Sequence, residues 1–314
     1  MRLLRIWPDQ SHFGFMRFRR VSFPFSAFLS VLTALLFLTH GLNFGIDFKG
    51  GTLIELQARS GQADVAKVRQ TANAFGFGEV EVQEFGNAGG LSLRFPLQPG
   101  GEAGQSAVVQ KARATLENDF EFRRVETVGP RVSGELVQSG TIGVVLSVLA
   151  VLLYLWFRFE RELAVGAIIG TLHDIVLTIG FFVITRLEFN MTSIAAILTI
   201  VGYSLNETVV VFDRTRELLR RYKAMPTQQL LDLSINHTMS RTVMTAMTTA
   251  LSLLALVLFG GKAIEDFAIV MLFGVLICTY SAIFISSPVL IYIGVLGRGV
   301  DVPAKGPAVA QPAE

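Results

Sequence analysis

The sequence predicts a polytopic α-helical membrane protein with six transmembrane helices and an α+β domain inserted after the first of them. Three observations lead to this fold class. Only 17% of the 314 residues are charged, whereas soluble globular proteins have about 25%. Six long apolar runs are present. One polar stretch, 49–135, alternates in hydrophobicity as strands and amphipathic helices do.

Composition also limits the classes of function. The net charge of +2 is too small to indicate a nucleic-acid partner. The sequence has no G-x-x-x-x-G-K-[ST] phosphate loop, so the energy that this protein uses is not expected to come from a bound nucleotide. The single cysteine, Cys278, can form no disulfide within the chain. We expect neither an enzyme nor a cofactor or metal site.

A transmembrane helix needs about 20 apolar residues to cross the hydrocarbon core. The runs that approach or exceed this length are 23–42, 139–157, 163–185, 191–212, 242–259 and 267–295. The first run resembles a signal sequence, but no small-residue cleavage site follows it, so we interpret it as a retained anchor. We expect the tail to be disordered because it is rich in Pro and Ala. The chain therefore divides into an N-terminal segment (1–22), the first transmembrane helix (23–42), the α+β domain (43–135), transmembrane helices two to six (136–297) and the tail (298–314).

Basic residues indicate the orientation, because short loops rich in Lys and Arg stay in the cytoplasm. The first twenty residues contain five arginines. The loop between the fourth and fifth runs contains Arg214, Arg216, Arg220, Arg221, Lys223 and Arg241. The opposite short loops contain only Arg186 and Lys262. We therefore expect both termini in the cytoplasm and 49–135 outside, which is the periplasm of a Gram-negative host.

The outer stretch has the pattern of a compact α+β domain. The segments "TLIELQA", "EVEVQEF", "LSLRFPL" and "FRRVETV" have the alternation of strands. The segments "ADVAKVRQTANAF" and "SAVVQKARATLENDF" have helical spacing. The order β-α-β-β-α-β predicts a split, ferredoxin-like domain.

Polar residues inside the apolar runs are the candidates for function, because an ionisable group at membrane depth is costly. In the third run, Gly166 and Gly170 form a small-residue face that Asp174 continues four residues later. We therefore expect Asp174, next to His173, to point into the bundle. A purely structural hydrogen-bonded pair explains these two residues equally well.

The fourth run carries Asn206 and Glu207 several residues inside its cytoplasmic end. Gly202, Asn206 and Asp213 share one face of the helix, and Glu207 lies on a neighbouring face. The short side chain of Glu207 cannot easily reach water from that depth. In general, burial raises the pKa of a carboxyl and a nearby cation lowers it, so a carboxyl under both influences can exchange protons near neutral pH.

The fifth run has a polar stripe on one face, at spacings of four, three and four. Threonines in membrane helices often only bond back to their own helix, which is the simpler explanation. The arginine at the head of the stripe suggests more, because it lies in the same half of the membrane as Glu207 and could pair with it. The stripe is Arg241, Thr245, Thr248 and Ser252.

Five motifs occur together in a specific order: "GIDFKGG" at 45–51, "VGPRVSGEL" at 128–136, "HD" at 173–174, "GYSLNETVVVFDR" at 202–214 and "SRTVMTAMTT" at 240–249. They resemble the SecF family, the smaller partner in the SecD/SecF complex of bacterial protein export. The likeness covers nearly the whole chain except the tail. The chain departs from the family at Lys49, where a threonine is usual, and at Glu207, where an aspartate is usual. Glutamate keeps the carboxyl but lengthens its arm by one methylene.

The resemblance implies a membrane part of the resistance-nodulation-division type in the bacterial inner membrane. It implies a heterodimer with SecD that uses the proton gradient to help pull unfolded exported polypeptides out of the SecYEG channel. YajC and membrane lipid are further candidate partners. The family's proton path maps onto Glu207 and Arg241, and then onto Asp174.

The motif "NFGIDFKGG" ends the first run with charges and glycines. We interpret Gly45, Asp47, Gly50 and Gly51 as a joint that carries motion between the first helix and the outer domain. The paired glycines would allow a sharp backbone turn, and the charges of Asp47 and Lys49 would lie at the water boundary. The alternative is a plain turn with solvated charges.

Two other functions remain open at this stage. A small-molecule or ion transporter subunit is one, although six helices are only half of the usual set and the outer domain is small. A passive membrane scaffold, whose buried charges are structural, is the other.

Overall fold

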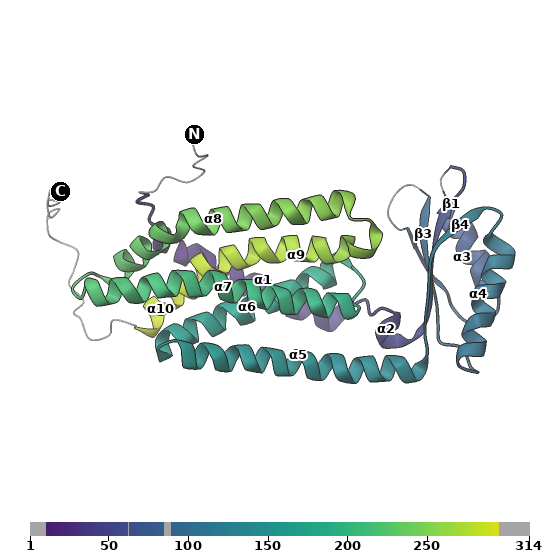
Figure 1. Cartoon of the computed structure of the whole chain (residues 1–314), viewed down its shortest axis with the longest axis horizontal. Coiled ribbons are helices and arrows are strands. Elements are labelled where there is room, and N and C mark those ends of the chain that lie inside the picture. Colours follow the sequence, from purple (N-terminus) through teal and green to yellow (C-terminus); the bar gives the residue numbers. More distant parts are fainter. Residues whose placement is uncertain (1–10, 62, 85–88, 295–314) are drawn as a thin grey trace.

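Six long helices form the larger part of the molecule in the computed structural model (Figure 1), which describes residues 11–61, 63–84 and 89–294. By length and composition all six can cross a membrane, as predicted. Five of them are α1 Arg19–His40, α5 Pro130–Arg158, α6 Arg161–Thr185, α7 Met191–Arg221 and α8 Thr227–Phe259. The sixth consists of α9 Lys262–Ser281, the π-helical turn η2 Ala282–Ser286 and α10 Ser287–Ile293. We call these helices the bundle.

Several helices extend beyond the apolar runs that predicted them. Helix α5 begins at Pro130 and α8 at Thr227, well before the runs that start at 139 and 242. An apolar run marks only the part of a helix that can lie in hydrocarbon, whereas polar residues continue the same helix into water. The predicted tail, 298–314, and residues 1–10 of the predicted cytoplasmic N-terminus lie outside the described residues.

Helices α6, α7 and the 264–293 helix form the centre of the bundle. Half or more of their most apolar windows is buried (56%, 50% and 56%), against only 11% for α5 and for α8. Close approach is possible because Gly166 and Gly170 of α6 face the sixth helix, where a Cβ atom would press against Leu290 or Ser286. The expected small-residue face is therefore a real packing surface.

Four strands and two helices form a sheet unit at one end of the bundle (Figure 1). The chain leaves α1 through the short helix α2 Ile46–Lys49. The strands are β1 Gly51–Ala58, β2 Glu81–Glu84, β3 Gly90–Phe95 and β4 Phe120–Val128, and the helices are α3 Val65–Asn73 and α4 Glu102–Leu116. This is the predicted element order. The sheet is antiparallel with strand order β2-β3-β1-β4.

The two faces of the sheet have different roles. One face packs against α3 and α4, and its core includes Ile54, Leu56, Leu93, Val108 and Ala112. The other face is turned toward the bundle (Figure 1). Strand alternation places polar residues such as Glu55 and Arg94 on that second face. A polar surface thus lies between the sheet unit and the end of the bundle.

Candidate functional site

Glu207 is buried inside the bundle, as its depth in the sequence predicted. It lies in α7 and is only 2% exposed. Its Oε1 accepts a hydrogen bond of 2.9 Å from the Thr245 hydroxyl of α8. The same hydroxyl lies 3.1 Å from the Arg241 carbonyl and 3.0 Å from the Thr242 carbonyl. Because a hydroxyl has one hydrogen, Thr245 can bond either the carboxyl or its own helix at a given time.

Two further hydroxyls belong to neighbouring positions on the same helices: Tyr203 lies one turn before Glu207 on α7, and Thr242 lies one turn before Thr245 on α8. Both hydroxyl oxygens are buried, and among the described residues neither has a hydrogen-bond partner of good geometry. A buried carboxyl surrounded by hydroxyls that can reorient can be hydrogen-bonded both with and without its proton. The surroundings of Glu207 therefore suit a group that changes its protonation state.

Arg241 is positioned differently from the expected pair. Its side chain is exposed, and among the described residues it makes no salt bridge with Glu207. Spacing along α8 puts Arg241 and Thr245 on one face, but the shorter Thr245 side chain reaches the carboxyl.

Asn206 and Thr248 are exposed as well. We call Asn206 of α7 and Arg241 and Thr248 of α8, the three exposed polar candidates, the open face. Nothing lies within 4 Å of a Cβ atom built on Gly202, one turn before Asn206. These three predicted candidates are thus exposed, whereas Asp174, His173, Glu207 and Thr245 are buried or half-buried.

A second buried carboxyl lies at the centre of the bundle. Asp174 of α6 is 0% exposed, as expected from the small-residue face. Its Oδ2 accepts hydrogen bonds from Ser204 of α7 at 2.6 Å and from Ser281 of α9 at 2.8 Å. Its Oδ1 lies 3.1 Å from Nδ1 of His173, whose Nε2 is buried without a partner among the described residues. The carboxyl thus joins three helices.

Sequence reasoning missed Ser204. Ser204 is three residues from Glu207, and this spacing was the available signal. Because the two residues lie one turn apart, α7 takes part in both carboxyl sites. Its Ser204 binds Asp174 of α6, and its Glu207 binds Thr245 of α8.

The glycine motif after α1 forms a bent connection, as predicted. Gly50 and Gly51 have φ values of +70° and +126°, which only glycine adopts readily. A Cβ atom on Gly51 would also overlap the Phe95 carbonyl. Asp47 is more than a solvated charge, because its Oδ2 accepts a 2.9 Å hydrogen bond from the Met191 amide and so caps α7. Lys49 is exposed.

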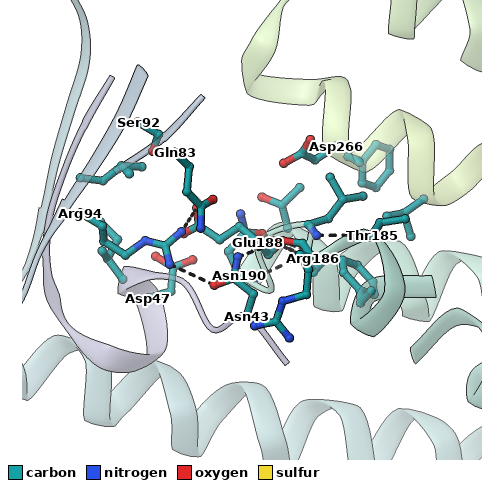
Figure 2. A pocket seen from close by; sticks show the side chains of 18 of the residues that line it. Asn43, Asp47, Gln83, Ser92, Arg94, Thr185, Arg186, Glu188, Asn190 and Asp266 are labelled. Carbon is teal, nitrogen blue, oxygen red and sulfur yellow. Dashed lines mark hydrogen bonds and ion pairs between the residues drawn. The ribbon is translucent and has the colours of Figure 1, made fainter. Parts of the chain in front are cut away.

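A polar cavity of about 490 Å³ lies between the sheet unit and the bundle (Figure 2). Burial raises the pKa of Glu55 in this cavity, and Arg124 partly opposes the effect. No group of acidic, histidine or cysteine side chains suited to a metal ion occurs among the residues that the structure describes. The charged residues that line the cavity are Asp47, Glu55, Glu84, Arg94, Arg124, Glu126, Arg186, Glu188 and Asp266.

Comparison with known proteins agrees with these features. Residues 108–295 match the family described as protein export membrane protein SecD/SecF, C-terminal, and residues 35–61 match the SecD/SecF GG motif. The chain is 43% identical to the protein translocase subunit SecF of Rickettsia bellii, over 91% of this chain and 95% of that protein. It is 40% identical to the subunit SecDF of Brucella abortus, over 96% of this chain.

Solved structures show the same architecture. The crystal structure of SecDF from Thermus thermophilus, a translocon-associated membrane protein, superimposes with a TM-score of 0.80 at 32% identity over 92% of this chain. A SecDF structure in a super-membrane-facing form gives a TM-score of 0.64 over the same share. The chain spans only 39% of these SecDF chains and 40% of the Brucella protein. The chain is a multi-pass membrane protein that belongs to the SecD/SecF family of protein-export membrane proteins.

Proposed function

We propose that the chain acts with SecD as an accessory subunit of the Sec translocon and uses the proton gradient to drive late steps of protein export. The observation that carries the proposal is Glu207, a 2% exposed carboxyl within a membrane-spanning helix, bonded to a hydroxyl of the neighbouring helix. A buried ionisable group in a membrane helix is costly, so its presence favours a functional role.

In this mechanism Glu207 takes up a proton in one state of the complex and releases it in another. Thr245 follows the change by switching between the carboxyl and the carbonyls of α8. Arg241 tunes the proton affinity through space. One charge that crosses 100 mV releases about 2.3 kcal/mol. That energy shifts a two-state equilibrium by about fifty-fold, which is enough to bias a domain movement.

The other predicted residues have supporting roles in the proposal. Asp174 and His173 form a second polar centre through which a proton can pass. Asn206 and Thr248 extend the path along the open face. The open face is the proposed contact with SecD, because SecDF relatives have more than half of their length outside the region that this chain matches.

We further propose that the chain lies in the bacterial inner membrane with both termini in the cytoplasm. The sheet unit is then a ferredoxin-like periplasmic domain, supported by its element order and antiparallel sheet. SecYEG, YajC and the unfolded exported polypeptide are proposed partners on the basis of the family. Labelling of a cysteine at the exposed position 111 of α4 from outside intact cells tests this orientation.

The test of proton coupling compares Glu207→Gln with Glu217→Gln, a matched change further along α7 at a side chain that is 59% exposed. Export of a secretory reporter is measured in membrane vesicles that contain SecD, with the proton gradient intact or collapsed. We expect the Glu207→Gln complex to accumulate normally but to lose the gradient-dependent part of export. We expect Glu217→Gln to retain that part. Normal gradient-driven export in Glu207→Gln would refute the proposal and favour a scaffold.

A further inference from the structure

A buried arginine crosses the interface between the sheet unit and the bundle. Arg94 of β3 is 9% exposed. Its Nη2 donates to Glu188 Oε2 at 3.0 Å and its Nη1 donates to Asn43 Oδ1 at 3.1 Å (Figure 2). The same Nη1 also donates to Glu81 Oε2 at 3.0 Å. Glu81 belongs to the sheet, whereas Asn43 follows α1 and Glu188 precedes α7. One side chain therefore binds three separate segments of the chain.

Other contacts hold the same segments together. The Gly45 amide donates to the Phe189 carbonyl at 2.9 Å, and the Phe189 amide donates to the Asn43 carbonyl at 2.8 Å. Asp47 caps the first residue of α7, Met191. Gly45 has no side chain where a Cβ atom would overlap the Glu188 carboxylate. The start of α7 is thus bound to the stretch that leads into β1.

Arg124 provides an internal comparison. It lines the same cavity from β4. Its salt bridges among the described residues, to Glu55 at 3.6 Å and to Glu126 at 2.6 Å, both stay within the sheet. Two arginines therefore carry the same charge into one cavity, but Arg94 alone of this pair bonds across the interface to Glu188.

We propose that Arg94 is a positioning residue that fixes the sheet unit to the start of α7, so that a displacement of α7 is transmitted to the sheet. This inference rests on the proposed function, because α7 also carries Glu207. Helix α7 is continuous from Met191 to Arg221, so its two ends move together. A planar guanidinium suits this role because it holds several acceptors in fixed directions at once, which a lysine ammonium does not.

The experiment measures the geometry of the joint directly. Spin labels are attached to cysteines introduced at the exposed positions Lys111 of α4 and Ala195 of α7, in the full chain in lipid nanodiscs. The native Cys278 is buried and stays in place. The distance distribution between the labels is recorded for the unaltered background, Arg94→Gln and Arg124→Gln. Gradient-driven export in the presence of SecD is measured for the same substitutions.

We expect Arg94→Gln to broaden the distance distribution and to lose gradient-driven export, while Arg124→Gln retains both. An unchanged distribution in Arg94→Gln would overturn the inference, and so would normal export despite a broadened one. If Arg94→Gln does not accumulate in the membrane, the same two measurements on Gly45→Ala test the inference, because the added Cβ atom displaces the Glu188 carboxylate without changing any charge. The proposed function is tested separately: normal gradient-driven export in Glu207→Gln would refute it. The distance between the spin labels does not depend on that result.

Discussion

Replacement of Asp174 by alanine is expected to destabilise the bundle measurably, because this carboxyl joins α6 to α7 and α9. Two of its hydrogen bonds cross between helices, from Ser204 at 2.6 Å and from Ser281 at 2.8 Å. Hydrogen bonds between membrane helices contribute about 0.6 kcal/mol on average and up to about 1.7 kcal/mol. The two bonds together predict a loss of about 1 to 2 kcal/mol in the free energy of unfolding.

The measurement is the unfolding of the purified chain by SDS in mixed micelles. Asp213→Ala is the matched control, because Asp213 is a 43% exposed side chain on α7 that pairs with Arg158 at 2.7 Å. Exposed ion pairs contribute about 0 to 1 kcal/mol, so the control is expected to lose less. A double-mutant cycle with Ser204→Ala isolates one bond and is expected to give a coupling energy of about 0.6 kcal/mol. A loss for Asp174→Ala no larger than for the control would refute this account of the bundle centre.

Two further predictions concern packing and pH. Gly170→Val is expected to lower the thermal stability of the purified chain in detergent, because a Cβ atom there would overlap Ser286 Oγ, whereas Gly202→Val, with nothing within 4 Å, is expected to leave it unchanged. Equal melting temperatures would contradict this. Burial raises the pKa of Glu55 above its ordinary value of 4.5, so the folded state holds that proton more tightly than the unfolded state. This contribution to stability is complete below the unfolded pKa and is lost as the pH rises through the raised value. Glu55→Gln is therefore expected to slow hydrogen exchange of the β1 amides at neutral pH and to reduce its pH dependence. Faster exchange in the variant would refute the expected direction of the effect of Glu55 on stability.

The parts of the structure that follow from local pattern were predictable. Strand alternation and helical spacing gave the element order of the sheet unit, because each element buries one face. The G-x-x-x-G spacing placed Asp174 inside the bundle, because a helix face that contains Gly166 and Gly170 must meet a close neighbour. The turn at Gly50 and Gly51 followed from the conformational freedom of paired glycines.

The contacts between distant segments were not predictable from the sequence. Arg94 and Glu188 are 94 positions apart, and a charged residue on a strand ordinarily indicates a face in water. Only the placement of the sheet over the end of the bundle makes them partners. Arg241 shows a different limit: helical spacing put it on the face of α8 that meets Glu207, but spacing does not determine the direction of a long side chain.

Helix α7 connects the separate features of the molecule. Its first residue is capped by Asp47 of the glycine motif. Glu188, two residues before the N-cap Asn190, binds Arg94 of the sheet. Further along, Ser204 bonds Asp174 on one side, and Glu207 meets Thr245 on the other. A change in the hydrogen bonding of either carboxyl therefore acts on the helix that also holds the sheet unit. The proposed conversion of proton movement into domain movement depends on this shared helix, because α7 contacts both buried carboxyls and the sheet unit.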